Sequence, residues 1–258
     1  MADRDPSRCR ELIEMVRPEP VTALPPRRLA RTVLTQRWRD LAFVHWPADP
    51  DAVRRLLPPG VEPDTIDGTT YVGLVAFLTA ETGLRGGPHL PYVGRFAEMN
   101  VRVYSVDAAG RRGVVFLSLD AGRLAPVLPG RLAYGLPYRW SLMRTARRGD
   151  VHMYSCRRRW PASRGVTSRL AVRVGEPIDH PSGLDHFLTA RWGLHASRAG
   201  RTRYTPNAHP RWTLHRVDLV DLDDGLVAAG GLPGPAGPPA SLLWSPGLDV
   251  RFGPSLPA

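Results

Sequence analysis

Polar and ionisable side chains recur at alternate positions in the segment EMNVRVYSV, residues 98–106. Because successive side chains of a strand point to opposite faces, Glu98, Asn100, Arg102 and Tyr104 would share one face. Arg102 can hold a carboxylate through two parallel hydrogen bonds, and Glu98 can act as an acid or a base if burial raises its pKa. The pattern supports two interpretations equally: the polar lining of a cavity, or an outer face in water held by ordinary ion pairs.

A second group of candidate residues is the segment YGLPYRW at residues 134–140, which concentrates tyrosine, glycine, proline and arginine in a turn-prone stretch. All 35 basic residues of the chain are arginines. Arginine cannot form a Schiff base, because its guanidinium stays protonated and is a poor nucleophile. The segment is therefore either a site that works without an imine or a well-packed corner.

Other common catalytic and metal-binding patterns are missing from the sequence. The eight histidines form no HxxxH or HxH pair, and Cys9 and Cys156 form no metal motif. His180 and His186, each following an aspartate, come closest, but such groups near a helix start are usually caps and surface. There is no G-x-S-x-G, G-x-G-x-x-G or Walker A segment. We therefore expect neither a metal nor a cofactor.

The charge and hydropathy of the chain indicate which partners to expect. The net charge is +11, but the arginines are spread along the chain and no helix-turn-helix, zinc-finger or RNP pattern accompanies them, so we expect no nucleic-acid partner. No apolar run approaches the roughly 20 residues of a membrane span, and the N-terminus lacks the apolar region of a signal peptide. We expect a cytoplasmic protein without a membrane partner. Homo-oligomerisation is left open.

The elements that would position the candidate residues are mostly strands. Asp49 and Pro50 indicate the start of a short helix, and Ser182 with Asp185 resembles a capping box that opens another through HFLTARWGL. The segment at 122–138 is ambiguous between a broken helix and a loop. Segments with β-favouring or alternating patterns lie at 31–50, 69–81, 98–106, 113–120, 140–147, 151–159, 166–174, 201–206, 211–222 and 242–253.

Many strands with few short helices predict an α+β, mainly β fold, in which a barrel or a curved sheet removes exposed edges. We expect one domain at residues 29–258, preceded by a flexible N-terminal extension at residues 1–28, which is polar and rich in proline. The glycine- and proline-rich segment 83–96 is long enough to cover the mouth of a pocket.

The segment DAAGRRG follows the strand at 98–106 as a turn, and VVFLSLDAG returns the chain. We therefore expect residues 98–106 to pair antiparallel with residues 113–120. A buried Arg102 needs a partner, because an isolated buried charge costs several kcal/mol. Asp120, on the return strand of the hairpin, is the expected partner of Arg102.

Five stretches, in this order along the chain, carry a family resemblance: LAFVHWPADPDAVRRLLPPGVEPDTIDGTTYVGLVAF, FAEMNVRVY, GVVFLSLDA, YGLPYRW and LDHFLTARWGL. As a set they resemble the YqjF-like family, a bacterial family of unknown function placed in the acetoacetate decarboxylase-like superfamily. The resemblance covers roughly residues 30–253. It implies a curved antiparallel sheet that wraps into a double-layered, cone-like β-barrel around a cavity.

The resemblance also bears on the site. In acetoacetate decarboxylases the stretch similar to YGLPYRW reads Gly-Phe-Pro-Lys-Lys, in which the first lysine forms the Schiff base and the second depresses its pKa. On the shared Gly-x-Pro frame, Tyr138 takes the place of the nucleophile and Arg139 that of its cationic neighbour. The strand bearing Glu98 looks like the one that carries an active-site glutamate in those enzymes. We expect Glu98 to meet Tyr138 or Arg139.

These observations predict a protein that binds a small anionic or carbonyl-bearing organic molecule in a barrel cavity, without Schiff-base chemistry. An alternative is a lysine-independent lyase or isomerase in which Glu98 and Tyr138 act as acid and base. A third possibility is a protein without a ligand, whose polar face is structural. The residues expected to bind the ligand are Glu98, Asn100, Arg102, Tyr104, Tyr138 and Arg139.

Overall fold

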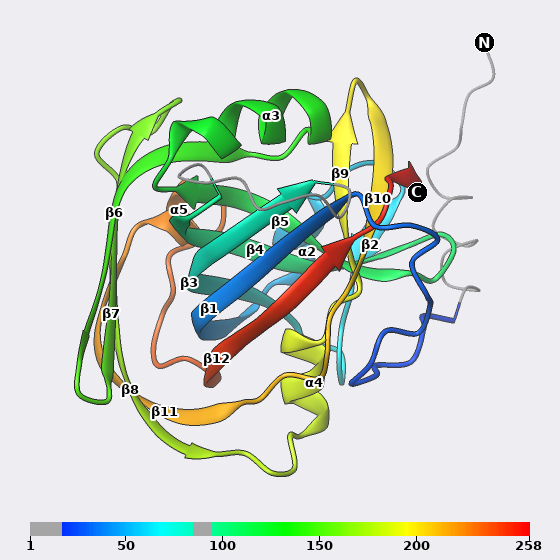
Figure 1. Cartoon of the computed structure of the whole chain (residues 1–258). Helices are drawn as coiled ribbons and strands as arrows, with labels where there is room; N and C mark the ends of the chain where they lie inside the picture. The colour runs from blue at the N-terminus through cyan, green and yellow to red at the C-terminus, as the bar shows by residue number, and fades with distance from the viewer. Residues whose placement is uncertain (1–16, 85–93) are drawn as a thin grey trace.

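The computed structural model describes residues 17–84 and 94–258, and thirteen strands join in one sheet (Figure 1). Their order is β13–β10–β9–β5–β6–β7–β8–β11–β12–β1–β3–β4–β2. The strands are β1 (Leu34–Ala48), β2 (Val61–Pro63), β3 (Thr70–Leu84), β4 (Phe96–Asp107), β5 (Arg112–Ala121), β6 (Tyr138–Arg148), β7 (Val151–Trp160), β8 (Thr167–Pro177), β9 (Gly193–Arg198), β10 (Arg201–Ala208), β11 (His215–Asp224), β12 (Ser241–Phe252) and β13 (Leu256–Pro257).

Short helices connect some of these strands, as expected for a mainly β fold. The Asp49 side chain accepts a hydrogen bond from the Asp51 amide and caps α2, and Ser182 with Asp185 forms a capping box on α4. None of the helices in the described ranges is long and apolar enough to cross a membrane. The helices are α2 (Pro50–Arg54), α3 (Leu124–Tyr134), α4 (Gly183–Thr189) and α5 (Leu226–Ala229).

The sheet closes on itself into a barrel. Strand β5 pairs with β4 on one edge and with β6 on the other, which completes a nine-stranded ring through β7, β8, β11, β12, β1 and β3. A second layer covers the other face of β4, β3, β1 and β12, where the hairpin β9–β10 joins β5 to β12. These four strands belong to both layers and are called the shared strands. The shared strands are thus covered on both faces, which gives the double-layered barrel that the family resemblance implies.

Apolar side chains fill the interior of the nine-stranded ring. The main core cluster includes Val44, Leu74, Met99, Val101 and Leu170, all nearly or completely buried. These residues come from strands on opposite sides of the ring, so this layer is a solid core. The second layer, between the shared strands and β9–β10, lies on the other face of β4.

The pairing of β4 with β5 is antiparallel, which confirms the predicted hairpin. Its register shifts between Val101 and Arg102, because β5 contains one extra residue, Leu117, between the partners of these two positions. A β-bulge of this kind moves every later side chain to the opposite face. Asp120 therefore lies opposite Met99 and points into the solid core layer. A regular hairpin would have placed it opposite Glu98.

The structure corrects one expected helix and resolves one segment that the sequence left ambiguous. The helix expected through HFLTARWGL ends at Thr189, and β9 begins at Gly193 instead, because the sheet recruits this stretch to pair with β10. The ambiguous segment at 122–138 forms α3, which ends at the left-handed Gly135. The expected pocket-covering segment 83–96 includes residues 85–93, which lie outside the described residues.

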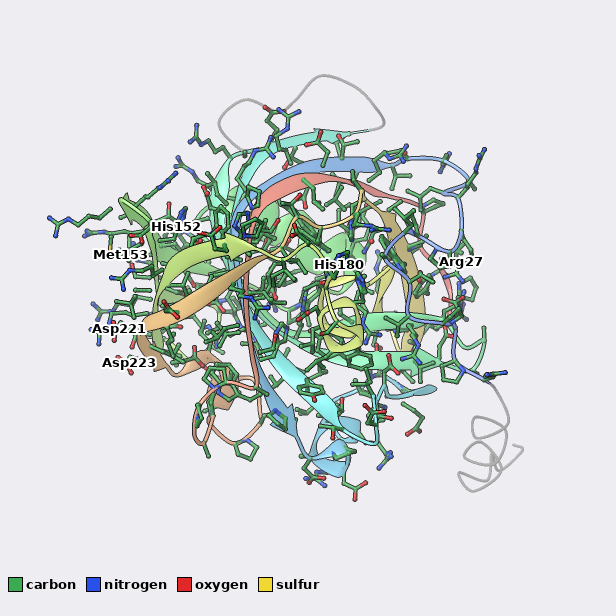
Figure 2. The ribbon with its side chains drawn as sticks, turned by 90° about the horizontal axis from the view of Figure 1, so that it is seen from below. Arg27, His152, Met153, His180, Asp221 and Asp223 are labelled. Carbon is green, nitrogen blue, oxygen red and sulfur yellow. The ribbon has the colours of Figure 1, made fainter. Side chains whose placement is uncertain are left out.

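The N-terminal segment that the structure describes, from residue 17 onward, lies against the barrel. The Glu19 amide donates to the Gly110 carbonyl, and Trp192 Nε1 donates to the Thr22 carbonyl. Arg27 donates to the Tyr204 hydroxyl, and Figure 2 shows it at the opposite side of the molecule from Met153 of β7. The extension expected at residues 1–28 therefore includes an attached part, whereas residues 1–16 lie outside the described residues.

A buried ion pair joins β5, β6 and β7. Arg158 donates from Nε to Asp120 Oδ1 at 2.9 Å and from Nη2 to Oδ2 at 2.7 Å, and Ser141 Oγ donates to Oδ1 at 2.7 Å. Asp120 is 0% and Arg158 2% exposed. Both carboxylate oxygens of Asp120 thus accept hydrogen bonds within the core.

Replacing Arg158 with methionine should destabilise the protein by about 3–5 kcal/mol, because it leaves the buried Asp120 carboxylate without its cation. The matched control is Arg157→Met, since the neighbouring Arg157 is exposed and such a change costs less than about 0.5 kcal/mol. Urea unfolding followed by tryptophan fluorescence measures both. Similar, small effects of the two substitutions would contradict the importance of the buried pair.

Candidate active site

A cavity of about 320 Å³ lies in the second layer of the barrel. Its walls come from β1, β3, β4, β5 and β12 on one side, from β9 and β10 on the other, and from α3 and the start of β6. Most of its surface is apolar, with contributions from residues such as Trp38, Phe116 and Phe252. Its polar lining residues are Gln36, Thr82, Glu98, Arg102, Tyr138, Thr189, Arg191, Thr205, Asn207 and His209.

Glu98 is 5% exposed and points into this cavity from β4. Its Oε1 accepts from Asn100 Nδ2 at 3.4 Å, and its Oε2 accepts from the Tyr138 hydroxyl at 3.3 Å. Burial and, to a smaller extent, the charge of Asp120 raise the pKa of Glu98, the two hydrogen bonds oppose this rise, and the resulting pKa is about 7. A carboxyl group with this pKa can both accept and donate a proton near neutral pH.

Tyr138 reaches Glu98 from the start of β6, as the sequence analysis expected. Its ring packs directly on Gly130 of α3, where an added Cβ would lie 2.4 Å from Tyr138 Cδ2. Arg131 Nη1 also donates to the Tyr138 carbonyl at 2.9 Å. Burial raises the pKa of Tyr138 well above its ordinary value, and the adjacent Glu98 adds to this rise. The phenol is therefore a hydrogen-bond donor at physiological pH.

Arg102 lies on the same face of β4 and lines the cavity, but it does not pair with Asp120. The expected pair was wrong because the bulge at Leu117 places Asp120 on the other face of the hairpin, where Arg158 binds it. Arg102 is 9% exposed, and its Nη2 donates to the Leu188 carbonyl at 2.8 Å. Among the described residues no carboxylate lies within ion-pair distance of Arg102, and its Nε has no hydrogen-bond partner.

The other two polar residues of the β4 face are completely or nearly buried. Asn100 is 3% exposed, and its Oδ1 has no partner within the described part of the chain. Tyr104 is 0% exposed; its hydroxyl donates to the Leu188 carbonyl and lies 2.8 Å from His45 Nε2. Burial, with Arg102 nearby, holds the pKa of His45 well below its ordinary value. Tyr104 thus fixes α4 to the sheet behind the cavity rather than lining it.

Arg139 lies apart from the cavity in this arrangement. It is half-buried on β6, in register with Asp120 of β5, and is not among the described residues that line the cavity. Burial lowers the pKa of Arg139, and the neighbouring Arg158 and Arg131 charges act in the same direction. Of the six residues expected at the site, Glu98, Arg102 and Tyr138 line the cavity, and Asn100 contacts Glu98.

The opposite wall contains residues that no sequence pattern predicted. Arg191 is 5% exposed, donates from Nε to the Phe187 carbonyl at 2.7 Å and pairs with the buried Asp64. Burial lowers the pKa of His209 to about 4, so its imidazole is neutral. Arg191 follows α4 and His209 follows β10, both far along the chain from Glu98. No local pattern marks them, because only closure of the second layer brings them to β4.

The pKa of Glu98 makes stability depend on pH in a specific direction. Because the folded pKa of about 7 lies above the ordinary value of 4.5, the folded state binds more protons between these values, and stability falls as pH rises through them. Glu98→Gln stays neutral at every pH. Its stability relative to wild type should therefore rise by about 3 kcal/mol between pH 4 and pH 8. Urea unfolding of both proteins at several pH values tests this, and parallel pH profiles would contradict it.

Solved structures of acetoacetate decarboxylase-like proteins share this fold. The enduracididine biosynthesis enzyme MppR complexed with pyruvate superposes with a TM-score of 0.60 at 17% identity, over 90% of this chain and 92% of that chain. The acetoacetate decarboxylase of Legionella pneumophila has a TM-score of 0.58 at 13% identity, over 98% of this chain and 96% of its own. At such low identity these similarities establish the fold alone.

Sequence comparisons identify nearer relatives. The model of the family DUF2071, described as an uncharacterized conserved protein, matches residues 35–249. The uncharacterized protein YqjF of Bacillus subtilis (strain 168) is 30% identical over 227 residues, which cover 86% of this chain and 91% of YqjF. These matches confirm the YqjF-like resemblance. The chain belongs to the DUF2071 family, to which its similarity with YqjF also points, and it has an acetoacetate decarboxylase-like fold.

Proposed function

We propose that this protein binds a small organic acid in the cavity beside Glu98, Arg102 and Tyr138. The ligand carries a carboxylate and can carry a carbonyl group next to it. The observation that carries the proposal is the charge of Arg102. A buried cation without a counter-ion is costly, and a site that retains one gains most from an anionic ligand. A carboxylate can accept two parallel hydrogen bonds from a guanidinium, which matches the free Nε of Arg102.

The rest of the lining suits the body of such a ligand. Aromatic and aliphatic side chains dominate the walls, and a volume of about 320 Å³ lies at the lower end of small-molecule pockets. Tyr138 and a protonated Glu98 can donate hydrogen bonds to a carbonyl or hydroxyl oxygen. The pyruvate complex of MppR, a protein of similar fold, supports the same class of ligand by analogy.

A second candidate function is proton transfer at the carbon next to a carbonyl group. It rests on the 3.3 Å contact between Tyr138 and Glu98, in which the carboxyl has a pKa of about 7. Glu98 would remove or return the proton, and Tyr138 would hydrogen-bond to the carbonyl oxygen as charge develops on it. This would be a lysine-independent lyase or isomerase, since the chain has no lysine for an imine.

Replacing Arg102 with methionine should abolish binding of 2-oxo acids, a loss of at least about 100-fold in Kd, because it removes the cation from the cavity. Calorimetric titration with pyruvate and with longer aliphatic and aromatic 2-oxo acids measures this. Arg144→Met, which removes an exposed arginine of β6, is the control and should bind as wild type does.

The stability of the two variants provides an independent check. Because no carboxylate among the described residues depends on Arg102, Arg102→Met should not destabilise the unliganded protein and should unfold at the same urea concentration or a higher one. Wild-type affinity in Arg102→Met, or no binding of any organic acid to wild type, would contradict the proposal.

Proton transfer can be tested separately from binding. Wild-type protein in deuterated water should exchange the protons at the carbon next to the carbonyl of a bound 2-oxo acid, as followed by NMR. Glu98→Gln should slow this exchange by about 100-fold or more, since general acid–base catalysis contributes that much, while Tyr138→Phe should retain part of it. Binding without any exchange would support a binding protein and exclude this second function.

A further inference from the structure

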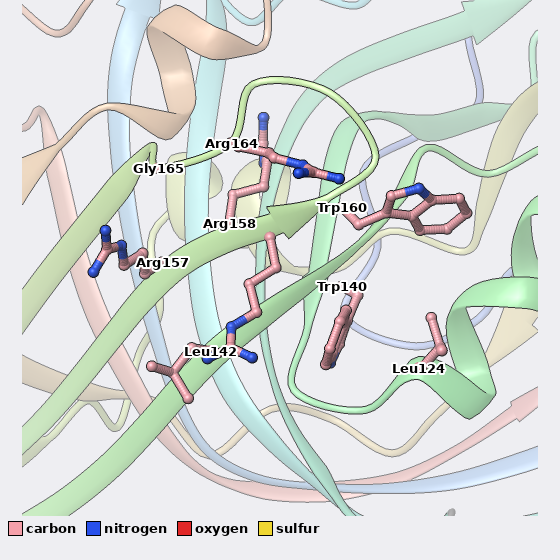
Figure 3. Close-up of a pocket in the computed structure, with 9 residues that line it drawn as sticks. Leu124, Trp140, Leu142, Arg157, Arg158, Trp160, Arg164 and Gly165 are labelled. Atoms are coloured by element: carbon pink, nitrogen blue, oxygen red, sulfur yellow. The ribbon is translucent and has the colours of Figure 1, made fainter.

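An open groove of about 820 Å³ lies on the outside of the barrel, away from the cavity. It runs between β6, β7, the turn at 161–166 and the first turn of α3. Figure 3 shows Trp140, Trp160 and Leu124 on one side of the groove and Arg157 and Leu142 on the other.

Apolar side chains in this groove are unusually exposed. Trp160 is 38%, Leu124 41% and Leu142 44% exposed. Trp140 pairs with Trp160 across β6 and β7 and also lines the groove. Large apolar side chains that gather in this way mark interaction sites. Tryptophan in particular carries much of the binding energy of protein interfaces.

The same region carries most of the net charge of the chain. Residues 138–166 include eight arginines and one aspartate, a net charge of +7 out of +11 for the whole chain. Arg157, Arg159 and Arg164 are exposed in the groove, and none of the three forms an ion pair with any described residue. Arg159 instead lies over the Trp140 ring, with its guanidinium carbon 5.4 Å from the ring centroid.

The floor of the groove is formed in part by a residue that is already paired. Arg158 lines it, but its Nε and Nη2 donate to Asp120 inside the barrel. Through Ser141 and Arg158, Asp120 ties β6 and β7 to β5, so the strands that carry Trp140 and Trp160 are held in place without a partner. A preorganised surface loses less conformational entropy on binding.

We infer that this groove binds an acidic segment of another protein that also carries apolar side chains. The arginines without an ion-pair partner among the described residues favour an anionic partner, and the exposed leucines favour aliphatic side chains, which nucleic acids lack. A second copy of the same face is disfavoured, because two surfaces of +7 would repel each other. This surface is independent of the cavity and of the function proposed for it.

The probe for the test is a short fluorescein-labelled peptide of glutamate, leucine and phenylalanine, and binding is followed by fluorescence anisotropy. The double substitution Arg157→Glu and Arg164→Glu should weaken binding by about tenfold or more, and Trp160→Ala should do the same through its apolar contact. The matched control is Arg201→Glu with Arg251→Glu, which changes the net charge equally at exposed positions of β10 and β12. It should weaken binding by less than about threefold.

Two comparison probes decide the nature of the partner. An all-glutamate peptide should bind at least about tenfold more weakly than the apolar one, because it cannot use the tryptophans and leucines. Equal binding of both peptides, or equal losses in the groove and control variants, would overturn the inference in favour of general charge attraction. Tighter binding of a labelled oligothymidylate, lost in the groove variant, would overturn it in favour of a nucleic-acid surface.

Discussion

The buried ion pair between Asp120 and Arg158 stands where the nine-stranded ring closes. The parallel contact of β5 with β6 spans only three residue pairs, so the ring depends on added side-chain bonds at this junction. Asp120 supplies them, because it accepts from Ser141 of β6 and from Arg158 of β7. Both sides of the junction carry a candidate site. On the cavity side β6 starts with Tyr138 against Glu98, and on the outer side β7 ends with the groove.

One extra residue in β5 decides which charges meet in the core. The bulge at Leu117 turns Asp120 away from the face of β4 that carries Glu98 and Arg102. The carboxylate then neutralises Arg158, and Arg102 is left in the cavity without a carboxylate from any described residue. A single shift of register thus separates a structural ion pair from a cation that a ligand can use. It is the physical basis of the proposal that the cavity binds organic acids.

Burial keeps carboxyl, phenol and imidazole side chains that line the cavity neutral, and they lie near an arginine that carries a positive charge. Burial keeps Glu98 protonated up to about pH 7, Tyr138 protonated well beyond its ordinary range, and His209 neutral. Arginine does not lose its proton under the same conditions. Under the proposed function, a carboxylate would meet the cation of Arg102 beside groups that donate hydrogen bonds, with little competing negative charge.

The sequence by itself determined the parts that depend on local pattern and composition. Alternation fixed the shared face of Glu98, Asn100 and Arg102, because the side-chain period of a strand is two. The cap at Asp49 and the absence of lysine needed no tertiary information either. Only the tertiary structure decided that this face lines a cavity, that Arg102 has no carboxylate partner, and that Arg191 joins it. These facts depend on a bulge and on pairings between distant strands, and side-chain periodicity alone carries no information about register or closure.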